Sequence, residues 1–362
     1  MIPHRFGKQN IVPSFQHRFG PIREVRFINQ LGPSGNVLPG VPDGGVHQLW
    51  VVKGIQNDPT IPNCALTQPN FEQQVKNNNV AFRIPLPMFG LGLIDSIQDR
   101  EILAHQAATA SQRAALGIGG HPNRSGNDGT ITRFGWKAQN KSITMFAGEA
   151  YNVEMGITNE LFPQAKEEDP ACNGPQKPEP NDVTRMGTDD SINQAFKNPL
   201  HILADWMQFQ LLMRFTDAPQ PDPYPSPSAQ RGRSVFSSIG CVLCHTPQMR
   251  TAPAMNSAVL QNRPVNLFSD LLLHHMGAGL ADDIIQGAAG PDEFRTTPLW
   301  GVGQRLFFLH DGRSTDLLDA INQHFSPASS DYPASEANAV INNFQSLQRN
   351  DKQAILDFLR SL

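Results

Sequence analysis

The stretch Gly240-Cys241-Val242-Leu243-Cys244-His245 decides how the rest of this sequence is interpreted. It contains the pattern Cys-x-x-Cys-His, which is the signature of haem c attachment. Two thiols three positions apart can each form a thioether bond to the porphyrin edge, and the adjacent histidine is then held beneath the iron as an axial ligand. The sequence therefore predicts one covalent haem c, bound through Cys241 and Cys244 with His245 on the iron.

Other uses of a Cys-x-x-Cys pair fit this chain less well. A thioredoxin-like redox pair is expected within a βαβ pattern, and a zinc site needs a second Cys-x-x-Cys or a His-x3-His, neither of which follows. A zinc-stabilised interaction domain therefore remains only if no haem attaches. The other two cysteines, Cys64 and Cys172, form a disulfide in an oxidising compartment or stay as two buried thiols in a reducing one.

Composition excludes several classes of partner. The chain has 362 residues, a net charge of −4 and no run of five or more basic residues, so it lacks the charge pattern of a nucleic-acid or anionic-membrane binder. No apolar run reaches the roughly 18 residues of a membrane span. Residues 1–30 also lack the pattern of a signal peptide. We expect no nucleic-acid partner and no membrane span.

A proline-rich stretch divides the sequence. Residues 217–230 read DAPQPDPYPSPSAQ, with proline at alternate positions, which disfavours helix and central strand. We expect an N-terminal domain over 1–216, a linker over 217–230 and a cytochrome c-like haem domain over 231–362. The predicted fold is mainly α and loop-rich. Its last helix carries an apolar stripe, with Asn350 or Asp351 as the N-cap; the stripe is formed by Ile355, Phe358, Leu359 and Leu362.

A haem iron held by His245 needs or excludes a sixth ligand, and that choice separates electron transfer from peroxide chemistry. His324 ends a predicted helix that starts near residue 314, and it shares a face with Leu317 and Ile321. Met276, after the apolar run 271–273, is the alternative ligand. Each of these residues could equally be an ordinary core side chain, and Arg313 either neutralises a haem propionate or only ends a loop.

Several longer stretches resemble one family, the di-haem c-type oxidoreductases, which are related to the bacterial di-haem cytochrome c peroxidases and the di-haem enzyme of methylamine utilisation. The similar segments after residue 230 are RGRSVF (231–236), SDLLLHHMG (269–277), EFRTTPLWGVGQRLFFLHDGR (293–313), LLDAINQH (317–324) and DFLRSL (357–362). Upstream, RFGWKAQ (133–139) and AGEAYNVEMGITNELFP (147–163) are similar to the segment around the first, peroxidatic haem of the family.

The resemblance implies roles for individual residues. His245 would be the proximal ligand of the second, electron-transferring haem, and His324 would be its distal ligand. Trp136 would lie between the two haems as an electron relay, and Glu154 would act as acid or base in the peroxidatic pocket. The Gln usual between them is replaced by Met145 or Phe146, which weakens the case for peroxidase chemistry.

The resemblance also implies a cellular compartment and redox partners. It predicts a periplasmic oxidoreductase, supplied with electrons by a small redox protein or a quinol-linked donor, with peroxide or a protein as substrate. Relatives bind calcium between their haem domains. Relatives also carry a first Cys-x-x-Cys-His that this sequence lacks, so we expect a sequence that starts after that motif, and a mono-haem electron carrier without catalysis of its own is the alternative.

Overall fold

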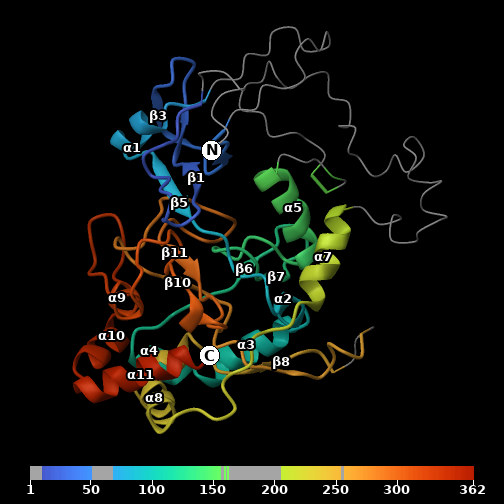
Figure 1. Ribbon diagram of the computed structural model, residues 1–362, viewed down its shortest axis with the longest axis vertical. Helices are drawn as coiled ribbons and strands as arrows, with labels where there is room; N and C mark the ends of the chain where they lie inside the picture. The colour runs from blue at the N-terminus through green and yellow to red at the C-terminus, as the bar shows by residue number, and fades with distance from the viewer. Residues whose placement is uncertain (1–9, 51–67, 156–158, 160, 163–204, 254–256) are drawn as a thin grey trace, which may run out of the picture. The chain divides into compact units, whose positions relative to one another are not determined.

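The computed structural model describes residues 10–50, 68–155, 159, 161–162, 205–253 and 257–362, and Cys64 and Cys172 lie outside these ranges (Figure 1). The chain divides into two compact units. The first comprises 1–85 and 144–210, and the second comprises 86–143 and 211–362. No helix among the described residues is both long and apolar enough to cross a membrane.

The described elements are short strands and helices joined by long loops. The strands are β1 (Glu24–Phe27), β2 (Asn29–Leu31), β3 (Val37–Pro42), β4 (Val46–His47), β5 (Val80–Arg83), β6 (Asn123–Arg124), β7 (Ile131–Thr132), β8 (Met249–Arg250), β9 (Pro264–Val265), β10 (Leu273–His275) and β11 (Glu293–Arg295). The α-helices are α1 (Phe71–Lys76), α2 (Leu91–Asp95), α3 (Asp99–Ala108), α4 (Ala110–Ala115), α5 (Ile143–Met155), α7 (Asp205–Phe215), α8 (Pro227–Ser238), α9 (Leu317–Asn322), α10 (Asn338–Gln345) and α11 (Arg349–Arg360). Two 3-10 turns are η4 (Cys241–Leu243) and η5 (Val302–Gln304).

The first unit is organised around a small antiparallel sheet of strand order β4-β1-β5. In β1, Val25 and Phe27 are fully buried while Glu24 and Arg26 are only partly covered, which is the alternation expected of a strand with one face on a core. Phe71 of α1 packs on this core, with its ring centroid 5.9 Å from that of Phe27.

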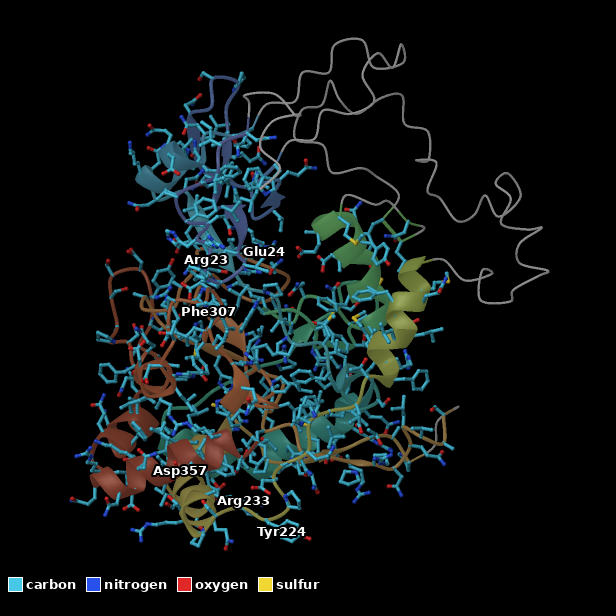
Figure 2. All side chains as sticks on the ribbon, viewed as in Figure 1. Arg23, Glu24, Tyr224, Arg233, Phe307 and Asp357 are labelled. Carbon is cyan, nitrogen blue, oxygen red and sulfur yellow. The ribbon has the colours of Figure 1, made fainter. Side chains whose placement is uncertain are left out.

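The second unit is built on the crossing of α8 and α11, the first and last helices of its C-terminal part (Figure 1). At the crossing, a Cβ added to Gly232 would lie 1.9 Å from the carbonyl oxygen of Ala354, so only glycine allows this approach. Ser228 donates a hydrogen bond of 2.6 Å to Asp357, which Figure 2 labels on α11. The two helices thereby pack directly on each other, and the loops that connect them in the sequence start and end at this helix pair.

The apolar stripe predicted for the last helix is confirmed. Ile355, Phe358 and Leu359 are each less than 5% exposed, and they share one core with Phe236 of α8. Burial of each such side chain stabilises the fold by roughly 2 kcal/mol. The cap differs from the prediction, because α11 begins at Arg349 and its N-cap is Gln348.

The fold class is confirmed in part. Ten α-helices and eleven short strands occur among the described residues, so helices dominate the second unit without making the whole chain clearly helical. The two units also divide the chain differently from the predicted domains, because 86–143 belongs with the C-terminal part. Within the predicted linker, 217–226 contains no helix or strand, but Ser226 caps α8 and Pro227 begins it.

Candidate haem site

The Cys-x-x-Cys-His segment follows α8 through one glycine. Gly240 has φ +105, a conformation that L side chains rarely adopt, and a Cβ there would meet Leu116 at 2.7 Å. Gly240 is the N-cap of η4, so Cys241 and Cys244 lie one turn of the 3-10 helix apart. Both cysteine side chains are partly covered. Burial, and then the neighbouring Cys244, raise the pKa of Cys241 to about 12. A thiol that resists ionisation does not resemble an activated redox pair.

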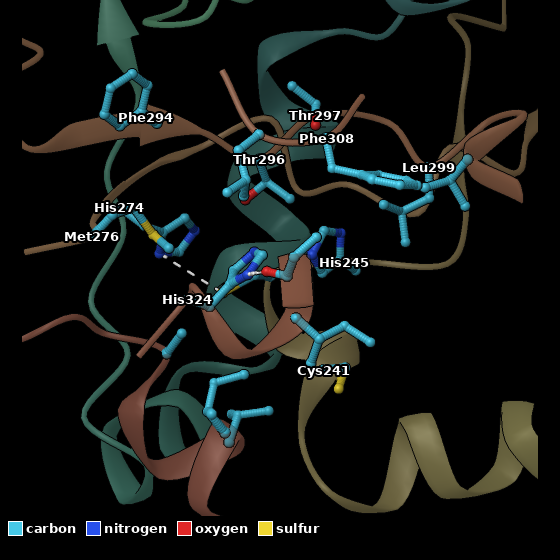
Figure 3. A pocket seen from close by; sticks show the side chains of 18 of the residues that line it. Cys241, His245, His274, Met276, Phe294, Thr296, Thr297, Leu299, Phe308 and His324 are labelled. Carbon is cyan, nitrogen blue, oxygen red and sulfur yellow. Dashed lines mark hydrogen bonds between the residues drawn. The ribbon is translucent and has the colours of Figure 1, made fainter. Parts of the chain in front are cut away.

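A cavity of about 220 Å³ opens beside this segment. Its walls come from the motif itself, from the loop between β11 and η5, and from α9, α10 and α11. Most of the lining is apolar, including Phe236, Leu299, Phe308, Leu317, Ile341, Phe344 and Leu359. Figure 3 shows Cys241, His245 and His324 in the same cavity. The lining therefore suits a flat apolar group attached at the two cysteines.

His245 has the orientation that an iron ligand needs. Its Nδ1 lies 3.1 Å from the carbonyl oxygen of Phe268, and because a carbonyl only accepts, Nδ1 carries the hydrogen. The lone pair is thereby on Nε2. Burial, and then the charge that His324 would carry, lower the pKa of His245 to about 4. The imidazole is therefore neutral at pH 7 and available to a metal.

His324 repeats this arrangement from a different element. It follows α9, whose first turn is capped by Asp316, and its Nδ1 lies 2.8 Å from the carbonyl oxygen of Ala320. Burial lowers the pKa of His324. The alternative ligand, Met276, also lines the cavity. The structure thus brings both candidates for the sixth position to the cavity, and only His324 has a ring nitrogen oriented by a backbone partner.

His274, next to Met276, cannot serve as an axial ligand. Its Nδ1 lies 2.6 Å from Glu336 and its Nε2 lies 3.0 Å from Asp270, so carboxylates occupy both nitrogens. Burial opposes a charge on His274, but Cys244 and Asp270 raise its pKa well above the usual value. Cys244, Asp270 and His274 have ligand atoms within 4.8 Å of one another, which is the arrangement that the zinc alternative would use if no haem attached.

Two arginines that the sequence analysis did not single out line the cavity. Burial lowers the pKa of each of Arg295 and Arg305 to about 10, and the charge of Arg305 adds a smaller lowering at Arg295. Arg295 donates to the carbonyl oxygens of Gly135 and Thr296. Among the described residues, no hydrogen bond or ion pair reaches the guanidinium of Arg305. Two cations in an apolar cavity fit the two propionate carboxylates of a haem.

Arg313 is not among the residues that line the cavity, and its contacts fit the alternative that it ends a loop. Its guanidinium donates to Asp311 at 2.6 Å and to the carbonyl oxygen of Gly279 at 2.7 Å, and the side chain is exposed. The signal for the other two arginines was present in the quoted segment 293–313. There Arg295 follows Phe294 and Arg305 precedes the apolar run 306–309, whereas Arg313 stands in a polar turn.

The predicted catalytic residues lie in different units. Trp136 lines the cavity, with its ring edge toward His310 at a centroid distance of 6.3 Å. Glu154 belongs to the first unit, near the end of α5, and its side chain is exposed. Partial desolvation, and then the charge of Glu24, raise the pKa of Glu154 to about 7. The structure therefore brings Trp136, but not Glu154, into the described cavity.

Taken together, the donor set fits a covalent haem. Two thiols lie at one edge of an apolar cavity, two neutral imidazoles have Nε2 lone pairs, and two buried guanidinium groups provide positive charge. The three residues that could hold zinc, Cys244, Asp270 and His274, include only one of the two motif cysteines, whereas haem attachment uses both. No calcium site is defined by this set of residues.

Comparison with known proteins agrees with this donor set. Residues 58–362 match the family described as "Di-haem oxidoreductase, putative peroxidase". No curated protein sequence matches the chain.

Among solved structures, the chain is similar to a MauG-like protein associated with microbial copper homeostasis. The identity is 15%, the TM-score is 0.38, and the match covers 77% of this chain and 90% of that one. It is also similar to the hydrazine synthase of Kuenenia stuttgartiensis, at 17% identity and a TM-score of 0.26, covering 43% of this chain and 55% of that one. The chain thus spans about half the length of that synthase chain.

Proposed function

The chain belongs to the di-haem oxidoreductase family, and from this premise we propose that it is a periplasmic c-type cytochrome oxidoreductase that transfers electrons through a covalent haem as part of a di-haem, peroxidase-like enzyme. One observation carries the proposal. His245 and His324 line one apolar cavity, and a backbone carbonyl fixes Nδ1 of each ring so that both Nε2 atoms are available.

In this proposal Cys241 and Cys244 would hold the haem, and His245 and His324 would bind its iron. The haem would supply one-electron oxidation and reduction. Two imidazole ligands would favour electron transfer over peroxide binding and would lower the potential relative to a His/Met pair. The apolar lining excludes water, while Arg295 and Arg305 offset the charge of the propionates.

The remaining roles follow from the position of Trp136. Its ring lines the cavity and is steeply inclined to the ring of His310, with a centroid distance of 6.3 Å, which supports a role in passing electrons from this haem toward a second one. Glu154, with a pKa near 7, would exchange protons at the peroxidatic haem. Electrons would come from a small redox protein or a quinol-linked donor, and peroxide or a protein would be the substrate.

A second function is a mono-haem electron carrier without catalysis of its own. It is favoured by the pair of histidines in the cavity, because an iron bound by both would have no site for peroxide. The two functions differ in whether any iron in the protein has an open position.

The test is to express the chain behind an export signal with haem c maturation and to measure intact mass, cyanide binding and peroxide turnover. We expect one covalent haem per chain in either case. Cyanide binding together with peroxide turnover would support the enzyme, because both need an iron with an open position, whereas a haem that neither binds cyanide nor turns over peroxide would support the carrier. A chain with no haem and two free thiols would contradict both.

A further inference from the structure

The two helices that cross in the second unit, α8 and α11, have a charge opposite to that of the whole chain. Together they contain five basic and two acidic residues, a net charge of +3, whereas the chain has a net charge of −4. We call α8 and α11 together the basic helix pair; its basic residues are Arg231, Arg233, Arg349, Lys352 and Arg360. The rest of the chain has an excess of negative charge, so this positive charge is local.

The acidic side chains of the basic helix pair are covered, whereas its arginines are exposed. Asp351 pairs with Arg231 at 2.5 Å, and Asp357 accepts a hydrogen bond of 2.6 Å from Ser228. The side chains of Asp351 and Asp357 are 17% and 30% exposed, but those of Arg231 and Arg360 are 64% and 52% exposed. A molecule that approaches this surface therefore meets mainly guanidinium groups.

Two of the arginines do nothing for the stability of the helices. Arg233, which Figure 2 labels on α8, and Arg349 are both exposed. In the part of the chain that the structure describes, neither guanidinium makes a hydrogen bond or an ion pair. Arg349 is also the first residue of α11, where the helix dipole favours a negative side chain. Helix stability thus does not account for this charge, which is available to a partner.

The basic helix pair borders the haem cavity. The ammonium of Lys352 lies 5.8 Å from the ring centroid of Phe344, and this ring lines the cavity. At the end of α8, Asn343 donates a hydrogen bond of 3.2 Å to the carbonyl oxygen of Ile239, and Cys241, two residues further on, is only partly covered. Between the positive surface and the cavity there is thus, at Lys352, a single aromatic ring.

We propose that the basic helix pair is the docking surface for the electron donor, and that this donor is a small acidic redox protein. The inference rests on the proposed function, because a donor docks here to reduce a haem in the cavity. Opposite charges accelerate encounter and orient the two proteins, and arginine is enriched in protein interfaces. One electron leaves the donor and reduces the iron from ferric to ferrous, and no bond forms or breaks.

The test is stopped-flow reduction of the haem-loaded protein by reduced flavodoxin, a small acidic protein whose flavin gives up one electron. We expect the second-order rate constant to fall about tenfold between about 20 and about 200 mM salt, because salt screens the attraction. Arg233→Glu with Arg349→Glu should lower the rate constant at low salt by about tenfold and weaken its salt dependence. Arg233→Lys with Arg349→Lys keeps both charges and should retain the wild-type rate constant.

Arg250→Glu with Arg263→Glu is the matched control, because it changes the net charge by the same amount. Both arginines are exposed on the β8–β9 hairpin, whose strand β8 contacts α3, and this variant should keep the wild-type rate constant.

Intact mass and reduction by dithionite, measured on the same samples, separate the two ways to fail. A chain without haem would overturn the proposed function itself. A haem that dithionite reduces, but that flavodoxin reduces at a rate independent of salt, would overturn the docking surface alone. The same conclusion would follow if the Arg233 and Arg349 reversal were no slower than the control.

Discussion

Two pairs of histidines in this molecule use the same donor atoms in opposite surroundings. His245 and His324 face an apolar cavity, and each is oriented by a backbone carbonyl. His121 and His275 stand about two-fifths exposed beside a shared carboxylate. An imidazole next to a carboxylate attracts a proton, whereas an imidazole in an apolar cavity stays neutral and suits a haem iron. The surroundings, rather than the residue type, thus separate the two roles.

The largest expected effect is the loss of the covalent haem that His245 and His324 would bind. Replacement of both motif cysteines, by Cys241→Ser with Cys244→Ser, should remove all covalent haem, because no other Cys-x-x-Cys-His occurs in the sequence. Intact mass measures this directly. Cys64→Ser is the control and should retain one haem. Covalent haem remaining in the double variant would show that attachment does not use this motif.

His324→Ala tests the sixth ligand. We expect haem to remain attached while the iron changes from low-spin to high-spin, because one axial position loses its imidazole. Absorption and paramagnetic resonance spectra measure the change. Met276→Leu lines the same cavity and should leave the low-spin spectrum unaltered. The reverse result, with a spectral change only in Met276→Leu, would assign the ligand to Met276.

A fall in pH should affect the protonation of the two pairs of histidines differently. The folded pKa values of His245 and His324 lie below the usual 6.5, so their neutral forms persist as pH falls, and the low-spin spectrum should be constant from pH 8 to about pH 5. The hydrogen bond that His121 donates to Glu293 raises the pKa of His121. His121 should therefore take up a proton already above pH 6.5, and nuclear magnetic resonance of its ring measures this.

Parallel titrations at several pH values check both halves of this prediction. A low-spin spectrum lost near pH 6.5 would contradict the burial argument for the haem ligands. A titration midpoint of His121 at or below pH 6.5 would contradict the effect of Glu293.

The smallest effect concerns the positive charge of the cavity. Arg305→Gln removes a cation that favours the reduced haem, so the reduction potential should fall by roughly 50 mV, which corresponds to slightly less than a tenfold change in the one-electron equilibrium. Spectroelectrochemistry measures the shift. Arg313→Gln is the matched control, since Arg313 is exposed and held by Asp311, and its potential should equal that of the wild type. Equal shifts in both variants would mean that Arg305 does not act on the haem.

Local patterns in the sequence predicted what local chemistry controls. The apolar stripe of the last helix is confirmed because a spacing of three and four residues fixes one helical face. Local patterns failed where a partner decides the outcome. Arg313 follows a histidine in a turn and looked like a propionate partner, yet its own neighbour Asp311 takes its guanidinium. The N-cap of α11 is Gln348, whose side chain makes no capping hydrogen bond, so Asn350 and Asp351 lie in the first turn of the helix.

The sequence by itself determined the haem attachment motif, because both thiols and the histidine lie within five consecutive residues, and the covalent chain fixes their spacing. Only the tertiary structure decided which distant groups join it. His121 and Glu293 are 172 positions apart, and Arg113 and Asp270 are 157 apart, yet each pair lies within 2.6 Å. Such contacts depend on how distant segments of the chain pair with one another when their backbone is buried. No local spacing in the sequence encodes them. The haem motif is thus a property of the sequence, whereas the charges around it and the second histidine group are properties of the fold.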